Sequence, residues 1–320
     1  MLIALIYLTV GLLVLIFGAD ILVRGASRLA VSFGIEPLIV GLTIVAVGTS
    51  APELAVSMMA AVAGHTDISF GNIVGSNVCN IALVLGLCAL MTPIRLGKGV
   101  LPFLPIMFLS SAAIPVMAFD GVIGRIDGLI LLAAATAYVI WMVRGHKPVS
   151  KEFETEVIDI TQDQESARST ATLYNALLII GGIVLLVGGS HAIVEGARTV
   201  ADYFGISERV IGLTLVALDT SLPELATSVI AVSRRETAIG IGNLVGSNIS
   251  NVLLVLGATS TVHAVPAALN RGRIIDIAVM LGVAAMLILF SKIGDSIKRW
   301  QGGIFFASYL AYMIFLIAGL

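Results

Sequence analysis

The sequence predicts an all-α membrane protein in which ten transmembrane helices form two inverted five-helix repeats, with both termini extracellular. Hydrophobic residues make up 58% of the 320 residues, charged residues make up 12%, and the mean hydropathy is +1.06. A soluble chain would carry about 25% charged residues. The polar residues here separate apolar runs of about 18 to 26 residues, each long enough to cross a hydrocarbon core of about 30 Å.

Ten apolar runs are expected to form the transmembrane helices. The first run has no basic segment before it and no evident small-residue cleavage site before Arg24, so we interpret it as a retained helix rather than a signal peptide. With the N-terminus outside, the inner loops hold 13 of the 18 lysine and arginine residues, as the positive-inside rule requires. We therefore expect a multi-pass protein of a plasma membrane or a prokaryotic inner membrane. The ten runs are residues 2–23, 37–63, 68–91, 100–119, 127–143, 173–194, 207–233, 238–262, 274–291 and 299–319.

The two halves of the chain are copies of each other. At an offset of 171 residues, 22 of the 40 positions in residues 41–80 are identical in residues 212–251. Each copy holds five runs, and an odd number of spans makes the second copy enter the membrane from the opposite side. We predict a first repeat over residues 1–143, a cytoplasmic linker over 144–172 and an inverted second repeat over 173–320. The acidic residues of the linker match no calcium-loop spacing, so a solvated linker is favoured over an ion sensor.

Each repeat carries a proline followed by a glutamate inside one of these runs, in the stretches GTSAPEL and DTSLPEL. Proline lacks an N–H group and its ring crowds the preceding turn, so Pro52 and Pro223 should bend or break their helices. Carbonyl oxygens freed in this way are tolerated in a membrane only beside protein or a polar cavity, and a cation would satisfy them. Glu53 and Glu224 would then lie in the first turn after each break, where the helix dipole favours a carboxylate.

Oxygen-bearing side chains form a stripe on four of the predicted helices, because a spacing of four residues keeps them on one helix face. Carboxylate, hydroxyl, amide and carbonyl oxygens suit sodium, calcium or magnesium rather than zinc or copper. An acidic side chain at the bilayer centre costs about 3 kcal/mol, so two at matching positions favour a functional site over protonated glutamates that bridge helices. Gly71 with Gly75, and Gly242 with Gly246, would let two of these helices approach their neighbours closely. The stripes are Thr49, Glu53 and Ser57; Thr220, Glu224 and Ser228; Asn72, Ser76 and Asn80; and Asn243, Ser247 and Asn251.

The duplicated motifs resemble the calcium/cation antiporter superfamily, and within it the sodium/calcium exchanger family of the prokaryotic type. They read GLTIVAVGTSAPELAVS with GNIVGSNVCN in the first half, and GLTLVALDTSLPELATS with GNLVGSNISN in the second. The resemblance implies an antiporter, not an enzyme, that exchanges sodium for calcium by alternating access. The second, third, seventh and eighth helices would hold the ions, while the first and sixth slide across them. The expected partners are sodium and calcium ions and the lipid bilayer, with no nucleic acid and no cofactor, and the protein would function as a monomer.

The same resemblance implies which residues hold the transported metal ions. Two glutamates would bind both sodium and calcium, hydroxyls would assist them, main-chain carbonyls and serines would complete the sodium positions, and two asparagines would line the centre. Such exchangers typically trade three sodium ions for one calcium, which makes exchange electrogenic. The implied residues are Glu53, Glu224, Thr49, Ser50, Thr220, Ser221, Ala46, Ala217, Ser76, Ser247, Asn80 and Asn251.

Two positions depart from the family pattern. Asp219 stands where the family, and the first repeat at Gly48, have glycine. Its carboxylate could be a third anionic metal ligand, could be protonated, or could point away toward a polar partner. Asn251 stands where several relatives, including the potassium-dependent branch, have aspartate, which argues against potassium co-transport.

Three other functions remain open on the sequence. A proton/calcium exchanger of the same superfamily would generally carry a glutamate shortly after the Gly-Asn pair, where this chain has Gly75 and Gly246. An intramembrane hydrolase would need two acids that share a water molecule. A passive channel would show no saturable, sodium-dependent counterflow.

Two features outside the motifs also lead to expectations. Asp20 and Arg24, four residues apart at the end of the first helix, are interpreted as a local ion pair rather than a gate. Their repeat counterparts are His191 and Glu195. Trp141, near the end of the fifth run, is expected to anchor that helix at the membrane interface.

Overall fold

The computed structural model describes residues 2–145, 167–203 and 208–318, without the side chains at 143, 145, 167–171, 201–202 and 208–218. Most of the predicted linker, including its acidic residues between 146 and 166, lies outside the described residues.

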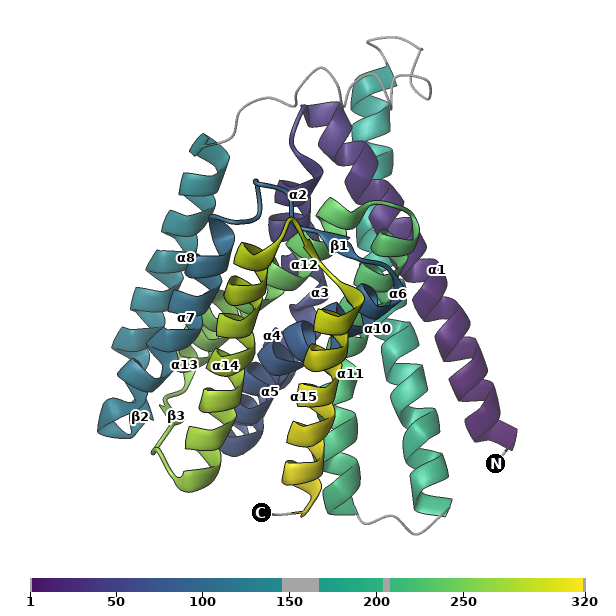
Figure 1. Ribbon diagram of the computed structural model, residues 1–320. Coiled ribbons are helices and arrows are strands. Elements are labelled where there is room, and N and C mark those ends of the chain that lie inside the picture. Colours follow the sequence, from purple (N-terminus) through teal and green to yellow (C-terminus); the bar gives the residue numbers. More distant parts are fainter. Residues whose placement is uncertain (1, 146–166, 204–207, 319–320) are drawn as a thin grey trace.

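Helices account for nearly all of the described chain (Figure 1). This is the expected outcome for apolar runs in lipid, because a helix satisfies its own backbone hydrogen bonds. The α-helices are α1 (Leu2–Phe33), α2 (Pro37–Val40), α3 (Ala46–Thr49), α4 (Ala51–Val62), α5 (Thr66–Val78), α6 (Gly86–Met91), α7 (Phe103–Met117), α8 (Arg125–Gly145), α10 (Ala167–Tyr203), α11 (Glu208–Ser233), α12 (Thr237–Ser250), α13 (Gly257–Val262), α14 (Arg271–Ile293) and α15 (Arg299–Ala318). The remaining helical segments are the π-helical η1 (Gly41–Val45), η2 (Cys79–Leu85) and η4 (Asn251–Leu256), and the 3-10 turn η3 (Ala118–Asp120).

The prediction of a multi-span, all-helical membrane protein is confirmed. In the described part of the chain, eight helices are long and apolar enough to cross a membrane, and the bent pair Pro37–Thr49 with Ala51–Val62 makes a ninth. Helix α11 lies where the run 207–233 was expected, but its first side chains are not described, so it is not included in this number.

Helices α1 and α10 extend well beyond the apolar runs that predicted them. The run 2–23 continues as α1 to Phe33, and Gly34, at φ +63°, then ends the helix. Helix α10 begins at Ala167, before the expected residue 173. Hydropathy marks only the part of a helix that lies in hydrocarbon, so a polar helical end such as the one that carries Arg24 is missed.

The proline-glutamate segments differ between the repeats. In the first repeat the helix is broken as predicted: α3 ends at Thr49, α4 begins at Ala51, and the two parts are bent by 41°. In the second repeat α11 continues through Pro223 as one helix. Pro223 leaves the carbonyl oxygen of Asp219 without its helical partner, and the hydroxyl of Ser190 on α10 donates to that oxygen instead. A side chain from a neighbouring helix therefore satisfies the freed carbonyl.

In the described part of the chain, four two-residue strands, which the all-α prediction did not include, join the two halves reciprocally. Strand β1 (Ile94–Arg95) pairs antiparallel with β4 (Ser296–Ile297), and β2 (Val122–Ile123) pairs antiparallel with β3 (Val265–Pro266). Strands β1 and β3 each follow the third span of their repeat, while β2 and β4 each lie between the fourth and fifth spans. Exchanging the two halves thus maps one pair onto the other. The strands pair backbone groups of the connecting segments, which lie outside the helices.

Glycines at seven-residue intervals bring α1 and α10 into backbone contact. A Cβ atom at Gly18 would lie 2.9 Å from the amide nitrogen of Leu186, and one at Gly189 would lie 2.7 Å from that of Leu15. Small residues allow this close approach in a membrane, so α1 and α10 form one tightly packed pair. The glycines are Gly11, Gly18 and Gly25 on α1, and Gly182, Gly189 and Gly196 on α10.

Two spans form the centre of the molecule. The most apolar stretch of Thr66–Met91 is 78% buried and that of Thr237–Val262 is 94% buried, against 17–39% for the other six single-helix spans. These two spans contain α5, η2 and α6 in the first repeat and α12, η4 and α13 in the second. They carry the predicted asparagine and serine stripes inside the protein, where a polar side chain needs a partner.

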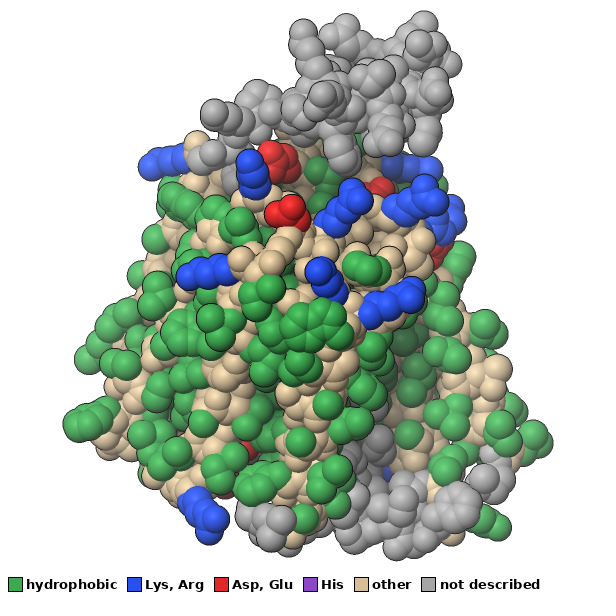
Figure 2. All heavy atoms as spheres, viewed as in Figure 1, with side chains coloured by type: hydrophobic (Ala, Val, Ile, Leu, Met, Phe, Trp, Pro, Cys, Tyr) green, Lys and Arg blue, Asp and Glu red, His purple; other side chains and the backbone are tan. Residues whose placement is uncertain are grey.

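The two ends of the molecule differ in charge. Figure 2 shows lysine and arginine side chains gathered toward one end, above a hydrophobic band. The first residues of α1 and the last residues of α15 lie toward the other end (Figure 1). Both described chain ends therefore lie on one side, opposite the basic side chains.

Candidate functional site

The two glutamates from the repeated motifs lie in one buried polar cluster. Glu53 lies in the first turn of α4, as predicted, and Glu224 lies one residue after the proline of α11. Both side chains are fully buried. The hydroxyl of Ser50, at the break between α3 and α4, donates to Oε1 of Glu224 at 3.4 Å. The proline-glutamate segments of the two halves are therefore in direct contact.

The carboxylates have few partners for groups so deeply buried. Ser247 donates to Oε1 of Glu224 at 3.5 Å, which is a long contact. Oε2 of Glu224 and both carboxylate oxygens of Glu53 accept no hydrogen bond from the described residues. A buried charge is costly unless it is paired or coordinates a metal ion. The arrangement thus supplies oxygen atoms that a cation can satisfy.

Two threonine hydroxyls connect the halves across this cluster. Thr49 on α3 donates to Oδ1 of Asn243 on α12 at 3.0 Å, and Thr220 on α11 donates to Oδ1 of Asn72 on α5 at 3.0 Å. The two contacts are counterparts at the repeat offset of 171 residues. Both threonines are buried next to serine hydroxyls, since Thr49 lies 3.5 Å from Ser247.

Ser76 and Ser221 extend the cluster on the other side. The hydroxyl of Ser76 lies 3.4 Å from that of Thr220. The hydroxyl of Ser221 donates to the hydroxyl of Ser76 at 3.4 Å. All three side chains are buried. The structure therefore brings the predicted hydroxyl residues of both repeats together around the glutamates.

Asn80 and Asn251 occupy π-helical turns, which the sequence did not predict. Asn80 is the second residue of η2 and Asn251 is the first residue of η4, and the two occupy equivalent positions of the repeats. A π turn re-aims side chains and is frequent at functional sites. Among the described residues, neither polar atom of the Asn80 side chain has a hydrogen-bond partner. Nδ2 of Asn251 donates to Oδ1 of Asn77 at 3.1 Å, while Oδ1 of Asn251 accepts no hydrogen bond from the described residues.

The main-chain oxygens implied as sodium ligands are less free than expected. The carbonyl of Ala46 already accepts the amide of Ser50 at 3.0 Å and lies 3.3 Å from the hydroxyl of Thr49. A carbonyl oxygen has two lone pairs, so the amide of Ser50 leaves one that a cation can use. Ala217 lies on α11 within residues 208–218, outside the described side chains.

Asp219 faces the α1–α10 pair. The hydroxyl of Ser190 on α10 lies 2.7 Å from carboxylate Oδ1 of Asp219 and also contacts the carbonyl oxygen of Asp219, so its single proton is shared between the two oxygens. In the described part of the chain, no group of three or more aspartate, glutamate, histidine or cysteine side chains is placed to hold one metal ion. In this conformation Asp219 is therefore not grouped with Glu53 and Glu224.

Sequence reasoning missed Asn77 as a member of the cluster. Its Nδ2 lies 3.4 Å from the carbonyl of Asn248, and its Oδ1 holds Asn251. The repeated GSN triplet was a usable signal, because it places an asparagine directly after each site serine. The second copy behaves differently: the amide of Asn248 donates to the carbonyl of Leu244 in its own helix.

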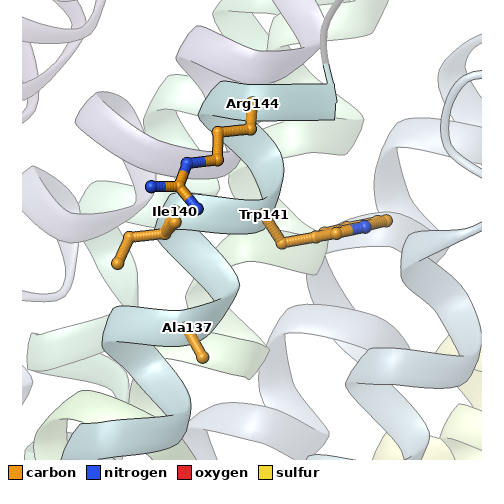
Figure 3. Close-up of a pocket in the computed structure, with 4 residues that line it drawn as sticks. All are labelled: Ala137, Ile140, Trp141 and Arg144. Atoms are coloured by element: carbon orange, nitrogen blue, oxygen red, sulfur yellow. The ribbon is translucent and has the colours of Figure 1, made fainter.

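An open, mostly apolar groove elsewhere has no part in this cluster. It is lined on α8 by Ala137, Ile140, Trp141 and Arg144 (Figure 3). Trp141 is half exposed there, as an interfacial anchor requires. None of the predicted ion ligands lines the groove.

The chain is similar to known membrane proteins, among them sodium/calcium exchangers. The sodium/calcium exchanger protein family matches residues 3–144 and 174–318. The sodium/calcium exchanger MaX1 of Methanosarcina acetivorans is 31% identical over 97% of each chain. The inner membrane protein YrbG of Escherichia coli (strain K12) is 38% identical over 90% of this chain and 87% of its own. A solved structure of the sodium-calcium exchanger NCX_Mj is 32% identical, covers 98% of each chain and superposes with a TM-score of 0.84.

The matched family segments cover both repeats and meet around the buried glutamates. The family is one of transporters rather than enzymes, and its members exchange calcium for other cations. The chain is therefore a multi-pass membrane protein that belongs to the sodium/calcium exchanger family.

Proposed function

We propose that this protein exchanges sodium for calcium across the membrane by alternating access. One observation carries the proposal: equivalent glutamates of the two repeats, Glu53 and Glu224, are buried in a single cluster of hydroxyl and amide oxygens. The donor set consists of hard oxygens. The relatives MaX1 and NCX_Mj, both named sodium/calcium exchangers, support the choice of ions.

The proposed metal ligands are those implied by the sequence, with one exception. Glu53 and Glu224 bind both ions, the hydroxyls of the neighbouring threonines and serines assist them, and Asn80 and Asn251 line the centre. The exception is Asp219, whose carboxylate we assign to Ser190 rather than to an ion.

The charge of the site sets the electrical character of exchange. Two carboxylates balance one calcium ion, whereas three sodium ions leave one positive charge to cross the membrane. Exchange of three sodium ions for one calcium is therefore electrogenic. Sodium and calcium exclude each other because both need Glu53 and Glu224.

Alternating access requires that one part of the protein moves against the rest. The glycine contacts make α1 and α10 a single body. Asp20 of α1 forms ion pairs with Arg24 of the same helix at 2.8 Å and with Arg234 in the turn between α11 and α12. Ser27 of α1 donates to Glu236 in the same turn at 2.8 Å. We call the contacts Asp20–Arg234 and Ser27–Glu236 the inner lock.

The inner lock joins the two repeats, but its ion pair has no copy at the repeat-related positions. The repeat counterparts of Asp20 and Arg234 are His191 and Ala63, and alanine carries no charge. The ion pair that closes the inner end therefore has no equivalent at the outer end. Ten spans with both termini outside complete the proposed topology, in agreement with the basic side chains gathered opposite the chain ends (Figure 2).

Transport into proteoliposomes tests the function. An outward sodium gradient should drive uptake of radiolabelled calcium, and Glu53→Gln or Glu224→Gln should abolish it while the protein stays folded. Calcium uptake that ignores sodium and follows a pH gradient would instead identify a proton/calcium exchanger. Uptake that neither gradient drives would identify a passive channel.

A further inference from the structure

Two buried asparagines, Asn72 and Asn243, contact both halves of the molecule beside the glutamates. Nδ2 of Asn72 donates to Ser57 at 2.9 Å and to the carbonyl of Glu53 at 3.2 Å, both in its own repeat. Its Oδ1 receives the hydroxyl of Thr220 from the other repeat. Asn243 is the counterpart in the second repeat. Each amide therefore uses one end to hold its own half and the other end to reach across.

The carbonyl of Glu53 fixes which way the amide of Asn72 points. A carbonyl oxygen can only accept a hydrogen bond, so the atom that faces it must be the nitrogen of the amide. The amide oxygen then faces Thr220, and because this oxygen has no proton, the hydroxyl of Thr220 must donate. The lone pairs of the Thr220 oxygen are consequently left for another partner, and Ser76 lies beside it at 3.4 Å.

The repeat-related arrangement is found at Thr49, whose hydroxyl lies near two acceptors. Its hydroxyl lies 3.0 Å from Oδ1 of Asn243 and 3.3 Å from the carbonyl oxygen of Ala46. Nδ2 of Asn243 donates to the hydroxyl of Ser228 at 3.1 Å while Oδ1 faces Thr49, the same orientation that the carbonyl of Glu53 imposes on the counterpart Asn72. Because a hydroxyl has one proton, a bond to Asn243 leaves the second lone pair of Ala46 uncommitted.

We propose that Asn72 and Asn243 are positioning residues for the ion site. They accept the hydroxyl protons of Thr220 and Thr49, so that the oxygen lone pairs of both threonines face the ion, and they hold the two half-sites in register. The proposal rests on the proposed function, because it assigns these amides to the cation site of Glu53 and Glu224. The asparagines act through the threonines and do not themselves bind the ion.

A double-mutant cycle on calcium binding tests this role. Purified protein in detergent is titrated with calcium chloride, and sodium chloride is then used as the competitor. Asn72→Leu removes the amide at similar volume, and Thr220→Val removes the hydroxyl. Each single variant should weaken calcium binding about fivefold, or about 1 kcal/mol at 1.4 kcal/mol per tenfold change. The double variant should bind calcium no more weakly than Thr220→Val alone, because Asn72 acts through the hydroxyl that this change removes.

Asn248→Leu is the matched control. Asn248 is a buried asparagine of the second central span, but its amide bonds only within its own helix. The Asn248→Leu variant should unfold at a lower temperature than the wild-type protein and bind calcium with the same affinity. If Asn72→Leu does not fold, Asn243→Leu with Thr49→Val supplies the equivalent cycle on the other repeat.

Two results would overturn the proposal. Losses that multiply in the double variant would show that Asn72 acts independently of Thr220. Unchanged calcium affinity in Asn72→Leu, as in the Asn248 control, would show that the amide has a packing role alone. The proposed function fails separately: a wild-type protein that binds calcium but shows no sodium-driven uptake would not be a sodium/calcium exchanger, while the positioning role would stand.

Discussion

The contact between α1 and α10 gives a sharp prediction, because two adjacent glycines of α10 have opposite surroundings. Gly189 is buried against α1, and a Cβ atom there would lie 2.7 Å from the amide nitrogen of Leu15 and 2.9 Å from the carbonyl oxygen of Gly11. Gly188 is exposed, and a Cβ atom there would meet no described atom within 4 Å. The variants Gly189→Ala and Gly188→Ala therefore add the same methyl group to the same helix in two environments.

The expected magnitudes follow from helix propensity and packing. Alanine favours a helix over glycine by about 1 kcal/mol, so Gly188→Ala should stabilise the protein by about that amount. At Gly189 the same gain is opposed by a contact that is 0.7 Å shorter than the ordinary 3.4 Å, and the nearest atoms belong to the rigid backbone of α1. Overpacking of this kind costs about 1–3 kcal/mol. Gly189→Ala should thus be less stable than Gly188→Ala by about 1–3 kcal/mol.

Thermal unfolding of the detergent-solubilised protein measures this difference, with sodium-driven calcium uptake as a second readout. Gly189→Ala should unfold at a lower temperature than Gly188→Ala and transport more slowly, because α1 and α10 no longer move as one body. Equal unfolding temperatures for the two variants would refute the backbone contact between the helices.

Three further changes have defined outcomes. Arg234→Gln breaks the ion pair with Asp20. Because exposed ion pairs contribute about 0.2–1 kcal/mol, the inner end should open more often, and labelling of an engineered inner-facing cysteine should rise up to about fivefold. Unchanged labelling would exclude the inner lock. Arg235 adopts a left-handed backbone at φ 65°, where the first repeat has Gly64 at φ 82°. Arg235→Gly should therefore stabilise the protein by about 1 kcal/mol in thermal unfolding, and a lower unfolding temperature would contradict this. Asp219→Asn should leave the ratio of sodium to calcium unchanged in flux measurements, whereas a changed ratio would make Asp219 a metal ligand.

The site could be found from the sequence because the duplication marks it twice. The proline-glutamate pair, the hydroxyls before it and the stripes on the following helices recur at one offset, and these residues form one buried cluster. Helical periodicity places Asn72 and Ser76 on one face. It does not show that Asn72 reaches Thr220, because that contact joins different repeats.

Other features depend on packing that periodicity does not contain. The π-helical turns at Asn80 and Asn251 lie within sequences that a regular helix would also fit. The paired two-residue strands join residues that are 142 and 144 positions apart in one pair and 201 and 203 positions apart in the other, which no local pattern reports. Such contacts follow from the arrangement of the halves rather than from any single element.

The two repeats also differ more in structure than in sequence. Gly246 packs closely, with a Cβ atom there only 2.6 Å from the carbonyl of Leu42, whereas a Cβ atom at its counterpart Gly75 would meet no described atom within 4 Å. The expectation of close approach is therefore confirmed for Gly242 and Gly246 but not seen for Gly71 and Gly75 among the described residues. A transporter that alternates between two conformations must place equal sequences in unequal surroundings, so this asymmetry cannot be read from the motifs.

The reversal potential of proteoliposomes under imposed sodium and calcium gradients is the decisive measurement of sodium/calcium exchange, because it fixes the identities and the ratio of the ions together. The account predicts a current that reverses at the potential set by three sodium ions for one calcium, and that disappears in Glu53→Gln. A reversal potential that ignores sodium and shifts with the pH gradient would contradict it.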